Sequence, residues 1–316
     1  MTTSGVAISR RADQGASALA RPSVTERYAE SIAAYVLVLP GATLLGLLFL
    51  LPLIAIAAIA TTNWHFGNSS LSFVGLKNFR QVFVDPTFRS SLFNTMIYVL
   101  IVVPGTVGFG LLVALLIEAG ESLRRFYRAI HFIPFMATLA ATAIAWEMLL
   151  HPTIGLFNQA LLAIGFPTTN WLRDERTVLP ILALIGVWQN AGFAMVLFLA
   201  GLKAIPNEIY QAADIDGADG WFDRLSTVTL PMLGPVSMFV LIVVAIRAFQ
   251  VFDTVAILTQ GGPGRASEVL LYTLYRESFE YLRTGYGATV TIVFLAIIVV
   301  LTLAQAWIMS RRVHYS

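Results

Sequence analysis

The sequence predicts an all-α membrane protein with six transmembrane helices. Of the 316 residues, 57% are hydrophobic and only 12% are charged, and the mean hydropathy is +0.77, well above that of an ordinary soluble domain. Six runs contain no Asp, Glu, Lys or Arg, and each is close to or above the roughly 20 residues that a helix needs to cross the hydrocarbon. These runs are residues 31–60, 90–117, 129–146, 177–202, 225–246 and 284–310.

The first three runs follow a polar N-terminal tail. Residues 1–30 are rich in Ser, Ala and Arg, and we expect them to form a disordered cytoplasmic tail. The run at 31–60 has about twice the apolar length of a cleaved signal peptide, so it predicts an uncleaved span. The third run is short, and we expect its helix to extend past Glu147 to about Leu150. Prolines in or beside the runs indicate kinks or helix ends, because neighbouring helices satisfy the freed carbonyls: Pro40, Pro52, Pro104, Pro134, Pro180 and Pro235.

The Lys and Arg residues predict the orientation of the spans, because cytoplasmic loops retain an excess of them. With the N-terminus inside, eleven of the 20 basic residues fall in inner segments, eight fall in outer segments and Arg247 lies within a span. The excess is clearest where short segments flank a helix closely, as in "RRFYR" at 124–128 and in the terminal "SRRVHYS". The sequence therefore predicts that both termini are cytoplasmic.

The segment at 203–230 separates the fourth and fifth runs on the predicted cytoplasmic side. Asn207 is placed to cap a helix that continues through "EIYQAADI", and Gly217 predicts the end of that helix because glycine accepts the left-handed conformation. Asp219 is placed to cap a second short helix that extends to about Ser226. The pattern predicts a helix, a corner and another helix, although a hydrophilic connector that only separates two spans is the alternative.

This segment resembles the cytoplasmic signature of permease subunits of binding-protein-dependent ABC importers. The signature reads Glu-Ala-Ala, three residues, Gly, nine residues, Ile, one residue and Leu-Pro. The chain has Gln211-Ala212-Ala213, then Gly217, then Val228 followed by Thr and Leu-Pro. Gln211 replaces the usual Glu, and ten residues rather than nine separate Gly217 from Val228.

Further stretches resemble the carbohydrate and glycerol-phosphate branch of that family, and most of all its first, maltose-type permease subunit. They are "FVGLKNFRQVF" at 73–83, "LFLAGLKAIPNEIYQAA" at 197–213, "FQVFDTVAILTQGGPG" at 249–264 and the "RRVHY" ending. The likeness extends from about residue 33 to the end of the chain. It implies the type I importer permease fold over residues 31–316, in the inner membrane of a bacterial cell.

The resemblance also implies partners and a coupling site. The partners are a second permease subunit, two copies of a separate ABC ATPase and an extracytoplasmic solute-binding protein, with membrane lipid around the spans and no nucleic acid. In the family, this loop docks on the ATPase and transmits its closure to the spans. The residues that the resemblance assigns to coupling are Gln211, Ala212, Ala213, Asp216, Gly217 and Ala218. The acidic excess of the loop favours a basic receptor surface, although plain solvation also explains it: Glu208, Asp214, Asp216, Asp219 and Asp223 against Arg224.

The sequence contains no phosphate-binding loop. Such a loop needs Gly-Lys followed by Ser or Thr, and neither of the chain's two lysines directly follows a glycine. The "GGPG" stretch at 261–264 lacks a lysine and is expected to be a turn. The four scattered His and the absence of Cys predict neither a metal site nor a disulfide. We therefore expect no catalytic residues and no cofactor in this chain, with ATP and Mg²⁺ bound by the partner ATPase.

Polar side chains within the spans predict the path of the solute. A charged group in a span costs roughly 2.5–3.5 kcal/mol on insertion scales, so it tends to face a cavity or a partner. Arg247 is the one basic residue deep in a span. Gln250, at i+3, is expected on the same face, and Asp253, six residues on, is expected off that face. The fourth span adds a flat apolar surface and two amides suited to a sugar ring. The candidate pathway residues are Trp188, Gln189, Asn190, Arg247, Gln250 and Asp253.

Alternatives remain for these residues and for the class of transporter. Packing or hydrogen bonding between helices is the alternative for each pathway residue, whereas pairing with an anionic solute is a further hypothesis for Arg247. A secondary transporter would carry coupling carboxylates at mid-membrane and paired broken helices, whereas Glu147 and Asp253 lie towards span ends. A channel would need a repeated filter segment, and the sequence has none. The sequence thus favours an ATP-driven importer of a sugar, oligosaccharide, polyol or glycerol phosphate.

Overall fold

The computed structural model describes residues 24–67, 71–120, 122–218 and 220–310. Within them the regular secondary structure is helical, apart from an isolated antiparallel bridge between Thr62 and Phe73, and turns and loops connect the helices. The described residues divide into two units after Ala55. The expected tail at 1–30 lies largely outside the described residues, and the first helix begins within it, at Val24.

The first unit is one long apolar helical segment. It comprises α2 (Val24–Leu45), the π-helical turn η2 (Gly46–Leu50) and the start of α3 (Leu51–Ala60). From Ile32 to Ala55 its side chains are exposed almost throughout. A helix that is apolar on all sides needs lipid or another protein around it, because exposure of that apolar surface to water is unfavourable.

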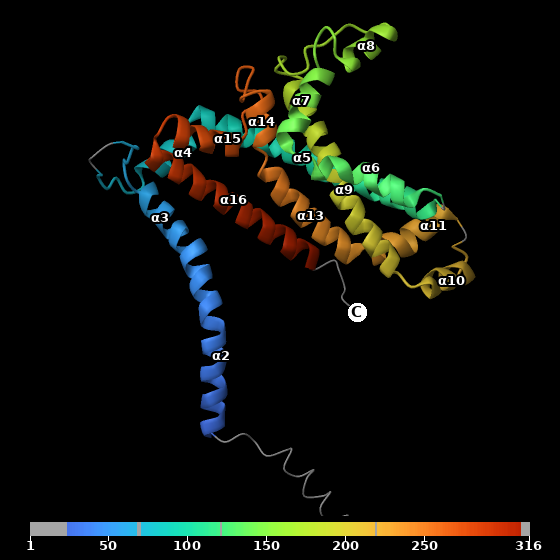
Figure 1. Cartoon of the computed structure of the whole chain (residues 1–316), viewed down its shortest axis with the longest axis horizontal. Helices are drawn as coiled ribbons and strands as arrows, with labels where there is room; N and C mark the ends of the chain where they lie inside the picture. The colour runs from blue at the N-terminus through green and yellow to red at the C-terminus, as the bar shows by residue number, and fades with distance from the viewer. Residues whose placement is uncertain (1–23, 68–70, 121, 219, 311–316) are drawn as a thin grey trace, which may run out of the picture. The chain divides into compact units, whose positions relative to one another are not determined.

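The second unit holds the remaining helices, whose order is shown by the colours of Figure 1. They are α4 (Lys77–Val84), α5 (Pro86–Ala119), α6 (Arg124–Met136), α7 (Leu139–Leu149), α8 (Leu156–Ala163), α9 (Val178–Ala204), α10 (Asn207–Ile215), α11 (Trp221–Arg224), η3 (Leu225–Thr229), α12 (Leu230–Met232), α13 (Gly234–Phe249), α14 (Asp253–Leu258), α15 (Leu270–Tyr275), η4 (Arg276–Glu280) and α16 (Thr284–Ser310). η3 and η4 are single π-helical turns.

The helices α5 and α9 form the centre of this unit. α6 packs on α9, and α13 packs on α5, α9 and α16. Glycines allow these backbones to approach closely: a Cβ on Gly110 would lie 2.7 Å from the Cβ of Ala194, and one on Gly192 would lie 2.0 Å from the carbonyl oxygen of His131. Small residues are common at contacts between membrane helices. Lipid is as apolar as the side chains and provides no hydrophobic driving force, so the helices associate through dispersion between closely packed backbones.

The apolar runs correspond to spans, with two corrections. Five helices of the described residues are long and apolar enough to cross a membrane, and there are six if α6 and α7 count as one broken span. The third run, expected to extend as a helix to about Leu150, is instead bent by 102° between α6 and α7, because Ala137 and Thr138 adopt extended backbone. The break follows Pro134, one of the prolines at which a kink or helix end was expected. The fifth uncharged run, 225–246, begins several residues before the span that the structure shows. Residues 225–232 form η3 and α12, and the long span begins at Gly234.

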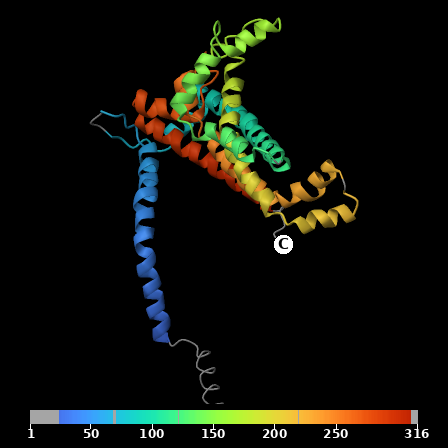
Figure 2. The ribbon, with the colours of Figure 1, turned by 45° about the vertical axis from the view of Figure 1, so that its right-hand side comes forward.

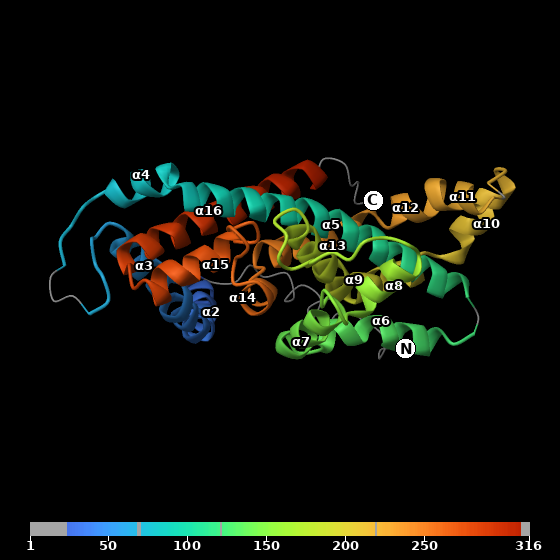
Figure 3. The ribbon, with the colours of Figure 1, turned by 90° about the horizontal axis from the view of Figure 1, so that it is seen from above.

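The second unit has two distinct ends. Figure 1 shows α10 and α11 at one end of this unit and α8, α14 and α15 towards the other, and Figures 2 and 3 show α10 and α11 projecting from the bundle. Near the projecting helices the core contains Phe198, Met195 and Leu233, which are fully buried. Towards the other end it contains Leu182 and Val255, which are also fully buried. The predicted coupling loop and the predicted external segments therefore lie at opposite ends of one packed bundle.

Candidate functional site

The 203–230 loop folds as a helix, a corner and a second helix. α10 ends at Ile215, and Gly217 follows with φ of +91°. The backbone N–H of Ala218 donates to the carbonyl of Ala213 at 2.9 Å, and that of Gly217 donates to the carbonyl of Asp214 at 3.2 Å. These bonds satisfy carbonyls that the helix end leaves free, and the left-handed residue between them favours glycine. The predicted stop at Gly217 is confirmed.

The start of the loop differs from the prediction. The N-cap of α10 is Pro206 in extended conformation, and Asn207 is the first residue of the helix, so the predicted cap at Asn207 is wrong. Ile205 and Pro206 have extended backbone after the end of α9, and helical backbone begins directly after them. The N-cap position therefore falls on Pro206, and Asn207 is already inside the helix. Asp219, the predicted cap of the second helix, lies outside the described residues.

Arg224 joins the two helices of the loop. Its guanidinium lies 2.8 Å from the carboxylate of Asp214, and its Nε donates to the carbonyl of Ala218 at 3.4 Å. The hydroxyls of Tyr210 and Thr229 share a further hydrogen bond of 3.1 Å. Asp214 is therefore neutralised within the loop, so the acidic excess that the sequence offers to a partner is smaller than the residue count indicates.

The tip of the loop exposes apolar side chains. Ile215 is 87% exposed, Trp221 65% and Phe222 70%. Of the predicted coupling residues, Gln211, Ala212, Asp216 and Gly217 are exposed, whereas Ala213 and Ala218 are half-buried. The sequence interpretation counted the charges of this loop and missed its apolar tip, although Trp and Phe next to each other in a polar segment are a visible signal of a contact surface.

A pocket of about 410 Å³ lies among α5, α6, α9, α13 and α14. Five of the six predicted pathway residues line it, namely Gln189, Asn190, Arg247, Gln250 and Asp253. Side chains that the sequence interpretation did not select also line it: Tyr98, Phe135, Thr138, Phe252 and Thr254. The pocket therefore combines amides, hydroxyls, a guanidinium and a carboxylate with aromatic rings, which is a lining suited to a polar solute.

Asp253 reaches this pocket because the helix breaks before it. α13 ends at Phe249 and α14 begins at Asp253, with non-helical backbone at Phe252. On a continuous helix Asp253 would lie off the face of Arg247, as predicted, but the turn at 250–252 brings both residues to the same pocket. The predicted separation of the two side chains is wrong for this reason.

Arg247 is held by aromatic rings. Its guanidinium carbon lies 4.9 Å from the ring centroid of Phe135 and 5.3 Å from that of Phe193, and these two rings stack at 5.1 Å. Among the described residues, none forms an ion pair with Arg247 or accepts a hydrogen bond from it. Contacts of this kind stabilise a cation by about 0.5–2 kcal/mol and leave its N–H donors available.

Trp188 does not line the pocket. Its ring meets that of Trp146 edge-on, with centroids 5.4 Å apart, and Trp146 stacks on Phe157 at 5.9 Å. The contact joins α9 to α7 and α8, segments distant in sequence, so the periodicity of α9 alone gave no signal of it. In this position Trp188 packs between helices, which is the alternative that the sequence left open for it.

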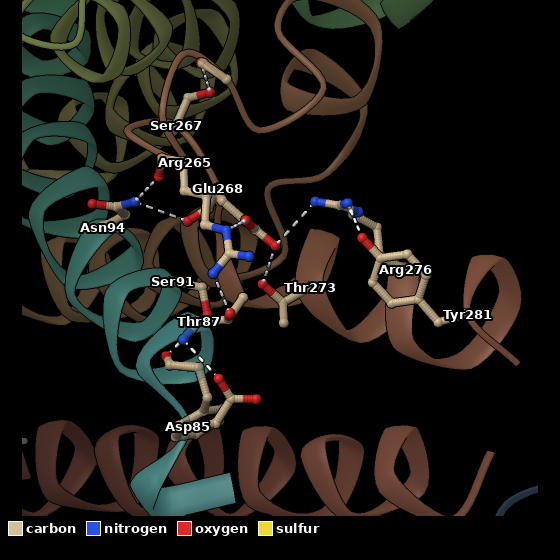
Figure 4. Close-up of polar contacts among 12 residues, drawn as sticks. Asp85, Thr87, Ser91, Asn94, Arg265, Ser267, Glu268, Thr273, Arg276 and Tyr281 are labelled. Atoms are coloured by element: carbon tan, nitrogen blue, oxygen red, sulfur yellow. Dashed lines mark hydrogen bonds and ion pairs between the residues drawn. The ribbon is translucent and has the colours of Figure 1, made fainter. Parts of the chain in front are cut away.

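A polar cluster fixes the segment between α13 and α16 against the start of α5 (Figure 4). Glu268 is 2% exposed; it accepts from the hydroxyl of Thr273 at 3.1 Å and lies 3.6 Å from Arg276. The side-chain amide of Asn94 donates to the carbonyls of Arg265 and Glu268 at 2.9 and 3.0 Å. The preceding turns contain the "GGPG" stretch, as predicted. A buried carboxylate with these partners holds the end of the bundle opposite to the 203–230 loop.

Asp85 caps α5 at the edge of this cluster. It accepts from the backbone N–H of Thr87 at 2.8 Å and from the hydroxyl of Tyr286 at 2.6 Å. Burial alone would raise the pKa of Asp85, but the hydrogen bonds from Tyr286 and Thr87, together with the charge of Arg283, outweigh burial and lower that pKa below its ordinary value.

Comparisons with known proteins agree with this architecture. Residues 87–314 match the family model described as "Binding-protein-dependent transport system inner membrane component". The sn-glycerol-3-phosphate transport system permease protein UgpA of Pectobacterium atrosepticum is 33% identical over 89% of this chain and 95% of its own length. The probable ABC transporter permease protein YurN of Bacillus subtilis is 32% identical over 86% of this chain and 94% of its own length.

A solved structure has the same fold. It is the crystal structure of a bacterial alginate ABC transporter in complex with an alginate pentasaccharide-bound periplasmic protein. One of its chains is similar with a TM-score of 0.79 and 21% identity, over 93% of this chain and 99% of that chain. At this identity the likeness concerns the fold.

Proposed function

Because the chain belongs to the family of binding-protein-dependent transport system inner membrane components, we propose that it forms the path of a sugar, oligosaccharide, polyol or glycerol phosphate through an ATP-driven importer. The observation that carries this proposal is the loop of α10 and α11, which projects from one end of the bundle with an exposed apolar tip. A polar pocket lies among the spans that this loop joins. The relatives named as glycerol-3-phosphate permeases support the class of solute.

The loop is built to transmit movement to the spans. The ion pair of Arg224 with Asp214 makes α10 and α11 one unit. That unit continues into the bundle, because Ile209, Tyr210 and Ala213 pack against the buried cluster that contains Val228 and Leu233. A separate ATPase that grips α10 would therefore displace α9 and α13 instead of only flexing the corner, and different contacts in its open and closed states would bias the transporter between two conformations.

The exposed tip supplies the contact with that ATPase. Ile215, Trp221 and Phe222 present apolar surface that water does not favour, and each Å² buried in a receptor cleft contributes about 25 cal/mol. The predicted coupling residues Gln211, Ala212, Asp216 and Gly217 are also exposed on this loop. ATP and Mg²⁺ are bound by the ATPase subunit, so this chain hydrolyses nothing by itself.

The pocket is completed by a second permease subunit. Arg247, Gln250 and Asp253 are exposed in the isolated chain although they lie within or beside an apolar span, which is costly in lipid. A second permease facing this surface would enclose the pocket and turn it into a path between the two subunits. An extracytoplasmic binding protein delivers the solute, and the assembly lies in the inner membrane with both termini of this chain in the cytoplasm.

The lining determines what the path recognises. The amides of Gln189, Asn190 and Gln250 offer donors and acceptors to hydroxyl groups. Asn190 already donates to the carbonyl of Gly186 at 2.8 Å, which fixes its orientation. The guanidinium of Arg247 keeps its N–H donors free for the solute, so it can bind either a sugar hydroxyl or a phosphate oxygen.

The test compares the chain alone with the complete transporter in proteoliposomes. The complete transporter is expected to hydrolyse ATP faster when loaded binding protein is present and to accumulate solute only with ATP, whereas the purified chain alone hydrolyses none. ATP hydrolysis by the chain alone, or uptake by the chain in vesicles without the ATPase, contradicts the proposal.

A further inference from the structure

A second cavity lies beside the pocket just described. It has a volume of about 490 Å³ and is lined by Phe252, Ala256, Gln260, Tyr272, Tyr275, Arg276 and Glu280. These residues belong to the break before α14, to α14, α15 and η4, and to the turn after α14, at the end of the bundle opposite to α10 and α11 (Figure 1). In the predicted orientation this is the external side, from which an imported solute arrives.

Phe252 lines both cavities. It stands in the break between α13 and α14 and is half-buried. The two cavities therefore share one wall residue. Arg247, Gln250 and Asp253 line the other of these two adjoining cavities.

The walls of the outer cavity are aromatic. The rings of Tyr272 and Tyr275 are nearly parallel, at 24° with centroids 6.4 Å apart, and Phe252 meets Tyr275 at 5.1 Å and 63°. Tyr275 is 37% exposed, whereas Tyr272 is buried. The faces of such rings are electron-rich, so they attract the polarised C–H groups that a sugar ring presents on its less polar face.

The polar rim of the cavity is fixed in place and nearly balanced in charge. Arg276 lies 3.6 Å from buried Glu268 and 3.3 Å from Glu280, and it also donates to the hydroxyl of Tyr281. Glu268 also lies 3.8 Å from Arg265, so two carboxylates are paired with two guanidinium groups here. A phosphate would find no unpaired cation at this rim and would meet the carboxylate of Glu280, whereas neutral hydroxyls find donors and acceptors on Arg276, Glu280 and Gln260 without that repulsion.

The geometry points to a sugar-binding subsite in this outer cavity, which holds one neutral pyranose ring against Tyr275 before the ring enters the Arg247 pocket. This inference rests on the proposed function and narrows its range of solutes. It assigns the transporter a solute that contains at least one uncharged sugar ring, and it excludes a simple glycerol phosphate as the occupant of this subsite.

The test uses the absence of cysteine from the chain. Ala256→Cys places one thiol in the wall of the cavity, and a membrane-impermeant maleimide labels it from outside in the complete transporter in sealed proteoliposomes without ATP. The probes are the methyl pyranosides of glucose, galactose and mannose, with sn-glycerol 3-phosphate as the anionic comparison. At ten times its dissociation constant, a bound ring slows labelling by about elevenfold, because the free fraction falls as 1/(1 + [L]/Kd).

Two further variants separate the ring from the thiol. Tyr275→Ala in the Ala256→Cys background is expected to abolish protection by the pyranoside, whereas Tyr275→Phe retains the ring face and the protection. A thiol at the exposed position Thr168→Cys, in the loop between α8 and α9, is expected to label at the same rate with and without sugar.

Three results would overturn the inference: no labelling of Ala256→Cys from outside, no protection by any of the pyranosides, or equal protection by glycerol 3-phosphate. Uptake by the same preparations with ATP keeps this result apart from the proposed function. Transport without protection rejects the outer subsite alone, while a failure of ATP-driven uptake rejects the proposed function.

Discussion

Gly217→Val tests whether the corner after α10 couples the ATPase to the spans. Gly217 has φ of +91°, and an added Cβ would meet no atom within 4 Å, so the substitution strains the backbone without creating a clash. The left-handed conformation costs a residue with a β-carbon about 1–2 kcal/mol, which corresponds to a factor of about 5–30 in the population of the corner. We expect ATP-driven uptake to fall by about that factor, while the amount of protein in the membrane is unchanged.

The chain contains a matched control for this substitution. Gly165 follows α8 with φ of +85°, and a Cβ there also meets no atom within 4 Å. The bonds around it repeat those of the corner: the N–H of Gly165 donates to Leu162 at 3.0 Å, and that of Phe166 donates to Leu161 at 2.9 Å. Gly165→Val therefore introduces the same strain at the end of the bundle away from the loop, and it should leave the coupling unchanged.

The assay measures uptake and ATP hydrolysis on the same proteoliposomes with saturating binding protein. In Gly217→Val, stimulation of hydrolysis by the loaded binding protein should decline together with uptake. Normal stimulation and uptake in Gly217→Val would show that the corner does not couple the subunits. An equal loss in Gly165→Val would show that backbone strain anywhere in the chain lowers activity.

Three further substitutions test other parts of the structure. Arg247→Gln keeps a donor but removes the charge, so it should nearly abolish uptake of an anionic solute and only weaken that of a neutral one; unchanged uptake at equal abundance would exclude Arg247 from the path. Trp221→Asp should reduce copurification of the ATPase with the permease, because it removes apolar area from the loop tip, and undiminished copurification would contradict that role. Asp85→Ala removes the cap of α5 and the acceptor for Tyr286, so it should lower stability by about 0.5–2 kcal/mol at neutral pH in thermal unfolding of the purified protein. Because the folded pKa of Asp85 lies below its ordinary value, this advantage of the wild type is present above pH 3.8 and is lost as the pH falls through the folded pKa; an advantage that persists in acid would contradict the assignment.

The sequence predicted the spans well because lipid imposes a strict requirement on them. An uncharged run long enough to cross the hydrocarbon is rarely anything but a membrane-spanning helix. For this reason α5, α9 and α16, which contain Thr106, Phe198 and Val290, were predictable. The corner at Gly217 was predictable for a local reason, since a helix end needs a left-handed residue. Polar side chains in spans also proved informative, because Arg247 and the amides of the fourth span do line one pocket.

Breaks in the spans were not predictable from apolar runs. Such runs do not show that Ala137 and Thr138 are extended or that the chain turns at 250–252, because these residues are compatible with a helix. Asp253 was consequently placed on the wrong face. In the described residues α6 and α7 form one bent pair, and the helix of α13 is interrupted before α14. The expectation that broken helices mark a secondary transporter therefore does not discriminate here, and membership of the family decides the class.

The π-helical turn η3, at Leu225–Thr229, explains how the loop tolerates its unusual length. This chain has one residue more between Gly217 and Val228 than the signature that it resembles. A π turn holds one residue more than an α turn over the same rise, so the additional residue is absorbed as a local bulge. The corner at one end and the Leu-Pro pair at the other thereby keep their places. An insertion at this point lengthens the chain without lengthening the helical segment between the corner and the fifth span. Removal of Ser226 should therefore restore an ordinary α turn in a transporter that still takes up its solute.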